Sequence, residues 1–148
     1  LLDRFPGQLK ETVVWNIEEA RRRQLAEHIE AGAKHAKIFR HMREFMQEYE
    51  FLACPVTQVP PFSHEIEWIT EVDGVEMQTY IDWMQSCSNI SVTGHPALSM
   101  PAGFTDDGLP VGLQLVGRHR ADRSLLEFGA TFEAATNVGQ RLPPQIRN

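Results

Sequence analysis

The chain has 148 residues, of which 42% are hydrophobic and 23% are charged, and its formal net charge at pH 7 is -6. This length and composition fit one globular domain spanning residues 1–148. No apolar run approaches the ~20 residues that a bilayer span requires, and the acidic balance disfavours nucleic acid, whose binders concentrate positive charge. We therefore expect neither a membrane nor a nucleic acid as a partner.

The sequence begins with Leu1 and not with methionine, which suggests a processed chain or an excised piece. Its only cysteines are Cys54 and Cys87, and the N-terminus carries no signal-peptide pattern. Two such thiols are typical of reduced residues, so we expect a cytoplasmic protein. A disulfide between the two cysteines stays open, as does a leader lost upstream of Leu1.

The first third of the chain shows helical periodicity. Residues 11–23 place Val14 and Ile17 three apart, which indicates a short helix. A stronger pattern covers residues 25–48, where apolar side chains recur every three or four positions: Ala26, Ile29, Ala33, Ala36, Phe39, Met42, Met46 and Tyr49. This spacing predicts an amphipathic helix whose apolar stripe is buried against a sheet. A coiled coil is the alternative, although the spacing does not settle into sustained heptads.

A short apolar run follows this helix. Residues 51–56 predict a buried strand, which ends in a loop that contains three prolines. The next region, residues 63–77, forms either a small hairpin around Asp73 and Gly74 or an ordered loop.

Residues 79–89 carry a second helical pattern. Four large or apolar side chains take the i, i+3, i+4 and i+7 positions of one helical face: Tyr80, Trp83, Met84 and Cys87. Small polar residues surround the end of this segment and allow a close approach to neighbouring backbone. The predicted helix therefore packs against a sheet or lines a cavity.

Two apolar runs in the last third, residues 97–100 and 111–116, are separated by Asp106, Asp107 and Gly108. Turn residues between apolar runs predict a strand, a turn and a strand.

A final helix is expected after this hairpin, with Asp122 as its N-cap. Gly139 and the prolines at positions 143 and 144 are expected to end the regular structure. Strands that alternate with helices indicate an α/β arrangement.

Residues 91–118 also carry a dense motif. It consists of Thr93, Gly94, Pro96, Ala97, Ser99, Pro101, Ala102, Gly103 and Phe104, followed by Gly108, Leu109, Pro110, Gly112, Leu113, Gln114 and Gly117. This motif closely resembles the C-terminal signature of the amidase-signature hydrolases. The resemblance implies that the chain is the C-terminal part of the amidase-signature fold, in which helices cover a mixed sheet.

The same resemblance implies that the full-length parent cleaves amide bonds with a Ser nucleophile, a second Ser in a cis peptide and a Lys base. Family members carry these groups in their N-terminal half. The chain has no Ser-Gly-Gly-Ser stretch, and Lys34 and Lys37 fall on the polar face of the long predicted helix. We therefore expect a C-terminal fragment of an amidase-like protein that holds no catalytic residue and is inactive alone.

Other catalytic and ligand-binding chemistries find no support in the sequence. No Gly-x-Ser-x-Gly elbow positions a nucleophile, and Ser99, inside an expected strand, is interpreted as structural. The helical histidines at positions 28, 35 and 41 are expected to face solvent, and His95 to lie in a loop. Motifs for zinc, phosphate and dinucleotide binding are absent. We expect no metal and no cofactor.

The resemblance also places the segment at residues 79–89 near the active-site cleft of related amidases. Candidate pocket-lining residues are therefore Tyr80, Trp83, Met84 and Cys87; ordinary core packing is the alternative for this face. Members that transfer ammonia usually have an acidic residue near the position of Met84. Although Asp82 is close by, this departure favours an apolar or aromatic amide over glutamine as the parent's substrate.

A second hypothesis comes from another functional class. The chain would be a binding or assembly module that associates with itself or with a separate chain, such as its missing N-terminal half. Half of a layered sheet leaves an unpaired strand edge and an exposed apolar face, and both favour association.

Overall fold

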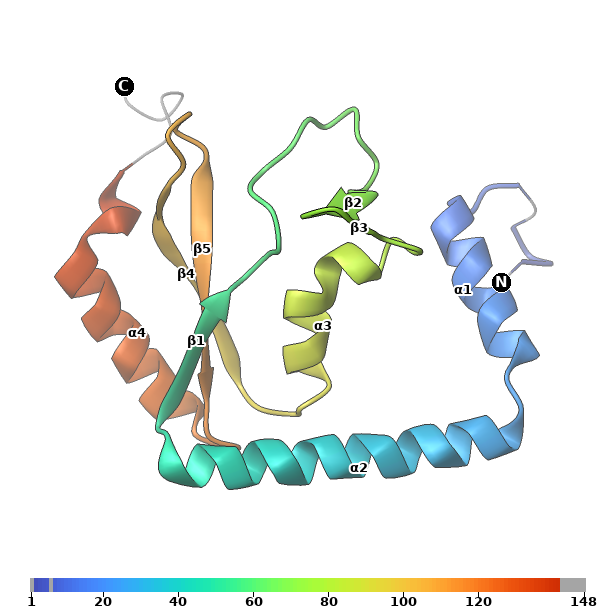
Figure 1. The fold of residues 1–148 in the computed structure, drawn as a ribbon, viewed down its shortest axis with the longest axis horizontal. Helices are drawn as coiled ribbons and strands as arrows, with labels where there is room; N and C mark the ends of the chain where they lie inside the picture. Colours follow the sequence, from blue (N-terminus) through green and yellow to red (C-terminus); the bar gives the residue numbers. More distant parts are fainter. Residues whose placement is uncertain (1, 6, 142–148) are drawn as a thin grey trace. The chain divides into compact units, whose positions relative to one another are not determined.

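The computed structural model describes residues 2–5 and 7–141. The chain divides into two compact units, Leu1–Lys37 and Ile38–Asn148. The first unit contains α1 (Glu11–Arg22) and the start of α2 (Leu25–Glu48), and the second contains the rest of α2 and every strand (Figure 1). No helix among the described residues is long and apolar enough to cross a bilayer. The single domain expected from the length stays a prediction.

Both N-terminal helices begin where the sequence predicts. In α1, Glu11 lies in the first turn and Arg21 and Arg22 lie in the last, an order that complements the helix dipole. At the start of α2, the Glu27 carboxylate accepts a hydrogen bond of 2.7 Å from the backbone N–H of Gln24. This bond and the guanidinium of Arg23 hold the pKa of Glu27 below its usual range.

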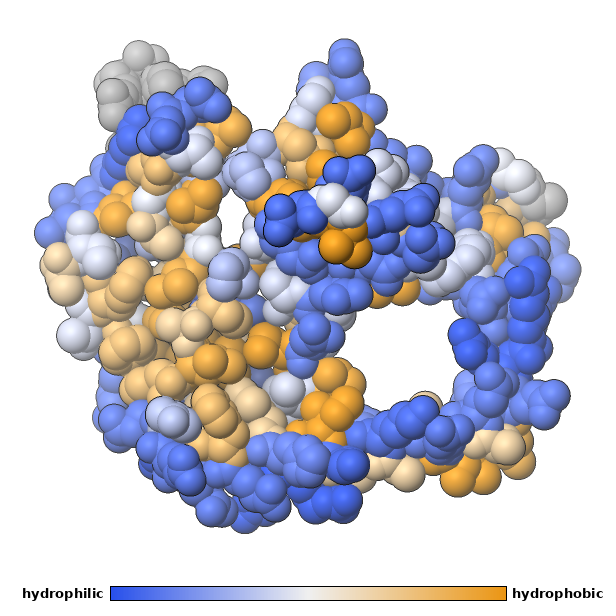
Figure 2. Space-filling model, viewed as in Figure 1, coloured by the Kyte–Doolittle hydropathy of each residue, from blue (hydrophilic) through white to orange (hydrophobic). Residues whose placement is uncertain are grey.

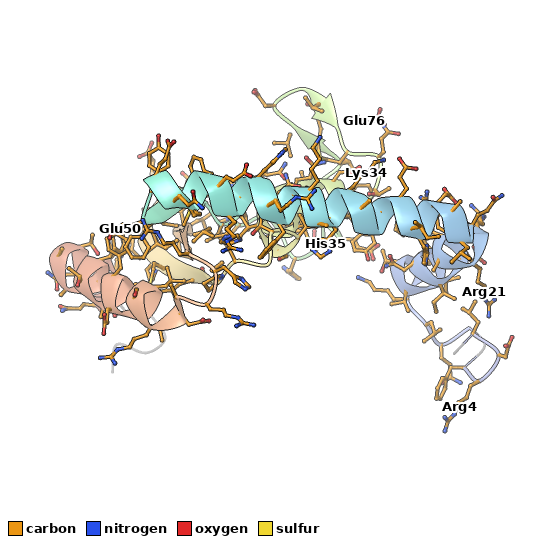
Figure 3. All side chains as sticks on the ribbon, turned by 90° about the horizontal axis from the view of Figure 1, so that it is seen from below. Arg4, Arg21, Lys34, His35, Glu50 and Glu76 are labelled. Atoms are coloured by element: carbon orange, nitrogen blue, oxygen red, sulfur yellow. The ribbon has the colours of Figure 1, made fainter. Side chains whose placement is uncertain are left out.

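The apolar stripe of α2 is buried only near its C-terminal end, so the prediction that the whole stripe is buried against a sheet is wrong for the described residues. Met46 is 2% exposed, whereas Leu25 is 77% and Ile29 67% exposed. Phe39 packs against Gly94 and His95, which lie in a loop before the sheet and not on its face. Polar side chains such as Lys34 and His35, which Figure 3 labels, are exposed on the rest of the helix beside these apolar ones.

The larger sheet has three strands, β1 (Phe51–Pro55), β5 (Pro110–Gly117) and β4 (Ala97–Phe104), in that spatial order. Both pairs are antiparallel, which confirms the predicted hairpin; the parallel pair that a mixed sheet needs is not among the described strands. A bulge interrupts the β4–β5 register between Pro101 and Gly103.

A separate two-stranded hairpin joins β2 (Glu71–Val72) to β3 (Val75–Glu76). Its two turn residues, Asp73 and Gly74, have φ angles of 50° and 76°. Positive φ at both positions is the geometry that short hairpins favour because it matches the strand twist. The hairpin interpretation of residues 63–77 is thereby confirmed over the ordered loop.

The helix α4 (Asp122–Thr136) covers one face of the sheet and forms the core with it. Leu125 packs with Leu115 of β5 and Met100 of β4. Phe128 stacks on Phe51 of β1 with ring centroids 4.3 Å apart. Figure 2 shows a broad hydrophobic surface over α4 and the adjoining strands.

The ends of α4 differ from the sequence-based expectation. Its N-cap is Ala121 without a side-chain hydrogen bond, so Asp122 is the first helical residue and not the cap. At the other end Asn137 adopts a left-handed conformation (φ 55°) and ends the helix before Gly139. A 3-10 turn, η2 (Val138–Gln140), follows. The expected stop at positions 143 and 144 lies outside the described residues.

The opposite face of the sheet is covered by α3 (Gln85–Ser91). Gln114 lies next to the core residue Leu115 and therefore points to the other side of β5, where its amide donates to the backbone of Ser86. Figure 1 shows α3 and α4 on the two sides of the strands. The α/β fold predicted from the sequence is confirmed.

The single helix predicted for residues 79–89 is wrong in its extent. A 3-10 turn, η1 (Asp82–Met84), comes first, and the α-helix begins at Gln85. The Asp82 carboxylate accepts the backbone N–H of Thr79 at 2.8 Å, and this bond favours a tight turn over a helical start. Tyr80 consequently lies before both helical elements.

Two helical glycines, one packed and one exposed, give a matched stability test. A Cβ at Gly129 would collide with Leu98 and lie 3.4 Å from the Met100 sulfur, whereas one at Gly32 would meet nothing within 4 Å. We expect Gly129→Ala to destabilise the fold by about 1–2 kcal/mol, because overpacking outweighs the gain in helix propensity. Gly32→Ala should stabilise by about 1 kcal/mol. Urea denaturation followed by circular dichroism measures both; equal shifts would contradict the close packing of α4.

Candidate functional site

A groove of about 1390 Å³ opens at the end of the sheet where β4 and β5 are joined. The loop after β1, the β4–β5 hairpin and the residues that follow α4 form its walls. Most lining side chains are apolar, among them Val56, Phe62, Phe104 and Leu113, and Arg141 is the one charged residue among the described lining residues. Such an apolar concavity with few polar groups is typical of a small-molecule site.

The loop after β1 closely approaches the hairpin because Gly112 has no side chain. A Cβ at Gly112 would lie 3.0 Å from Val56 Cγ2, which is closer than side chains normally pack. The backbone N–H of Val56 donates to the Gly112 carbonyl at 3.3 Å. Gly112 of the sequence motif, which lies within β5, therefore shapes the groove.

Of the four predicted pocket-lining residues, Trp83 lines this groove and Tyr80, Met84 and Cys87 do not. The Trp83 ring meets Phe62 edge to face with centroids 5.5 Å apart. Its Nε1 is buried and has no hydrogen-bond partner among the described residues. The other three side chains are half-buried, and their role in a substrate site stays a prediction.

The Val56 carbonyl joins the loop after β1 to α3. It accepts hydrogen bonds from Ser86 Oγ and from Cys87 Sγ, each 2.8 Å long. Ser86 also donates its backbone N–H to the side chain of Gln58 at 3.3 Å. These bonds hold Trp83, at the N-terminal side of α3, in the groove wall.

Gln114 completes this network from the central strand. Its Nε2 lies 3.1 Å from the Ser86 carbonyl and 3.5 Å from Cys54 Sγ. The hydrogen bonds that join Gln114, Ser86 and Gln58 are not predicted from the sequence, although Gln114 belongs to the family motif. One feature of the sequence could have indicated this network. Gln114 is a polar residue inside the apolar run of β5, and a buried amide needs a hydrogen-bond partner.

The residues considered as catalytic in the sequence are not brought together, and most of them are exposed. Lys34 pairs with Glu30 at 2.7 Å on the exposed face of α2, and this bond lowers the pKa of Glu30. His28, His35 and His41 are exposed on the same helix, as predicted. Ser99 is exposed in β4 and lines the groove, and His95 lies in a loop, where it is buried.

Metal chemistry finds no geometric basis in the part of the chain that the structure describes. No group of three or more His, Cys, Asp or Glu side chains there is placed to hold an ion. Cys54 and Cys87 are free thiols.

The shared acceptor at Val56 can be tested on α3 itself. We expect Ser86→Ala to cost about 1 kcal/mol, because it removes a partly buried hydrogen bond across two elements. Ser91→Ala is the matched control, since Ser91 Oγ makes an exposed hydrogen bond to the Cys87 carbonyl of the same helix. Its effect should be near zero. Urea denaturation compares the two, and an equally large loss for Ser91→Ala would contradict the bridging role of Ser86.

Comparison with known proteins identifies the family. Residues 3–126 match the model of the Amidase family. The chain is 28% identical over 138 residues to an acylamidase of Rhodococcus erythropolis, covering 93% of this chain and 29% of the relative. It is 35% identical over 106 residues to a glutamyl-tRNA(Gln) amidotransferase polypeptide of Moorella thermoacetica, covering 72% of this chain and 20% of the relative.

A solved structure shares the fold. The crystal structure of a bacterial aryl acylamidase of the amidase-signature family superposes with a TM-score of 0.79 at 23% identity, over 90% of this chain and 28% of that one. The chain thus spans between a fifth and a third of the length of these proteins. With the family match over most of the sequence, the chain belongs to the amidase family.

Proposed function

We propose that the protein is the C-terminal portion of a hydrolase that cleaves the C–N bond of carboxamides. In this proposal the chain supplies the scaffold and one wall of the substrate groove, and the Ser-Ser-Lys catalytic groups come from elsewhere in the full-length parent. The observation that carries the proposal is the amidase motif itself. It folds into the β4–β5 hairpin, and that hairpin lines the apolar groove of about 1390 Å³.

The groove chemistry supports an apolar or aromatic amide as the substrate. Phe62, Trp83 and Phe104 present aromatic rings or edges to it, and no acidic side chain is among its described lining residues. An acid would be needed to hold the ammonium group of glutamine. The name of the acylamidase relative supports an acyl amide as the substrate, whereas the name of the amidotransferase relative supports a transfer reaction on glutamyl-tRNA(Gln).

In this proposal the described residues do not hydrolyse an amide without help. That reaction needs an activated nucleophile and preorganised donors for the developing oxyanion. Ser99 lies in an extended strand, no lysine or histidine is among the described residues that line the groove, and Lys34 is exposed and ion-paired. Catalysis by residues outside this chain accounts for these features. The two free thiols support the cytoplasm as the compartment.

An activity assay of the 148-residue chain tests whether the catalytic groups lie outside it. We expect hydrolysis of 4-nitroacetanilide to stay at the rate of a protein-free blank, because no nucleophile is activated. Release of nitroaniline, followed by absorbance, measures this. Activity that copurifies with the chain and survives a second purification would overturn the proposal, and substitution of Ser99 by alanine would then show whether it is the nucleophile.

Ligand binding tests the groove independently of turnover. The protein has three tryptophans, and Trp83 lines the groove whereas Trp15 and Trp68 do not. We expect acetanilide to shift the Trp83 indole resonance in nitrogen-correlated NMR spectra and to leave the other two as internal controls. Trp83→Phe identifies the Trp83 signal by its loss. Equal shifts of all three indoles would indicate nonspecific contact and contradict the groove assignment.

An assembly module remains the second candidate. Exposed apolar side chains on α2, Leu25 and Ile29 foremost, favour association, as do the free edges of β1 and β4. The partner would be a second copy of the chain or the rest of the parent protein. Analytical ultracentrifugation that shows a strict monomer over a wide concentration range would exclude self-association.

A further inference from the structure

A second pocket, which we call the basic pocket, lies at the other end of β5. It has a volume of about 640 Å³ and lies between the C-terminal part of α2 and the loops before β4 and after β5. Eight residues line it: Phe39, Arg43, Met46, Gln47, His95, Arg118, His119 and Arg120. None of the proposed amidase chemistry involves them.

The walls of the basic pocket are fixed by packing and hydrogen bonds. The rings of Phe39 and His119 meet edge to face with centroids 5.0 Å apart, and His95 lies 5.8 Å from Phe39. Arg118 donates from Nε to the Met46 carbonyl at 2.8 Å and to the Tyr49 carbonyl at 3.3 Å. Arg118 therefore satisfies the carbonyl end of α2 and offsets its partial negative charge.

The backbone of Arg120 is strained where it lines the pocket. Its φ of 62° lies in the left-handed region, which costs a residue with a side chain roughly 1 kcal/mol or more. Strain of this kind persists where the surrounding structure fixes the conformation, and it clusters at ligand sites. The strained residue is also the third arginine that lines the pocket.

The charge of the basic pocket is opposite to that of the whole protein. Arg43, Arg118 and Arg120 line it, and none of its eight described lining residues is acidic, although the net charge of the chain is -6. Since Arg118 donates its Nε–H to carbonyls at the end of α2, Arg43 and Arg120 are the main guanidiniums available to a ligand. Arginine presents donors in a fork that matches the geometry of an oxyanion.

His95 gives an independent sign that something polar completes this pocket. The residue is 7% exposed, and its Nδ1 lies 3.0 Å from the Thr93 carbonyl, which makes Nδ1 the donor. The remaining Nε2 is buried and has no partner among the described residues. A buried polar atom without a partner costs about 1–3 kcal/mol and calls for an explanation.

These observations distinguish between ligand classes. His119 also uses Nδ1 toward a carbonyl, that of Gly94 at 3.1 Å, so two imidazoles could offer Nε2 to a metal ion. Three guanidiniums around them would repel a cation, and the described residues provide no third ligand of the usual kinds. We propose that the basic pocket binds a small phosphate-type oxyanion, as free phosphate or as the phosphate group of a soluble metabolite, with a P–OH group donating to Nε2 of His95 and the other phosphate oxygens accepting from the arginines.

Inorganic phosphate is the first probe, titrated into the 148-residue chain at constant ionic strength and followed by amide NMR. We expect saturable shifts centred on His95, His119 and Arg120. Phenyl phosphate, as the second probe, distinguishes a phosphate ester from the free ion by its relative affinity. Chloride at matched ionic strength should neither saturate nor compete in the same range, and equal competition by chloride would overturn the proposal.

Matched arginine variants locate the site. Arg43→Gln and Arg120→Asn should each weaken phosphate binding by about tenfold, because each removes charge-assisted hydrogen bonds. Asparagine is chosen at position 120 because it tolerates positive φ. Arg40→Gln removes an equal charge from the same helix outside the pocket and should change affinity less than about twofold, since exposed charges are screened by salt.

Three results would contradict the proposal. They are the absence of saturable binding, equal losses for the Arg43 and Arg40 variants, and shifts that map away from the basic pocket. Binding of an acidic peptide without any response to phosphate would instead assign the surface to a polypeptide. Amide spectra of each variant establish that it is folded, and two variants at independent positions keep the test decisive if one fails to fold.

Discussion

Two side chains of α3 share one acceptor, the Val56 carbonyl, and the groove depends on that arrangement. Ser86 and Cys87 draw the loop after β1 toward α3, while Gln114 reaches α3 from the central strand. Each of these hydrogen bonds joins two residues that lie 28 to 31 positions apart in the sequence. Because the bonds cross between elements, they determine where Trp83 lies relative to the hairpin. The apolar lining then follows from local sequence.

Local signals in the sequence predict most of the fold. Turn residues between apolar runs specify both hairpins, and the Asp73-Gly74 pair even specifies positive φ. The limits of α2 follow from its periodicity. The errors arise where a side chain competes with the helical pattern: Asp82 binds the Thr79 N–H and delays the helix, and Asn137 ends α4 by turning left-handed.

The sites are less predictable than the fold because they depend on contacts between distant residues. The family motif names the hairpin that lines the groove, and the helical spacing points to Trp83. Tyr80 falls on the same face only if one continuous helix is assumed. Arg118 donates a hydrogen bond to the carbonyl of Met46, which lies 72 positions earlier in the sequence. No periodic pattern in the sequence predicts such a long-range pair. The same holds for the buried Nε2 of His95, which only the packed structure reveals.

The central strand β5 begins in the groove and leads directly into the basic pocket. Its eight residues extend about 26 Å at the usual rise of a strand. That length exceeds the roughly 8–10 Å over which exposed charges influence one another in physiological salt. An anion held near Arg120 would therefore leave the electrostatic potential around Phe104, which pairs with the first residue of β5, almost unchanged. One strand thus places a strongly charged compartment and an apolar one at opposite ends of the same small scaffold, where the charge of the first has little effect on the second.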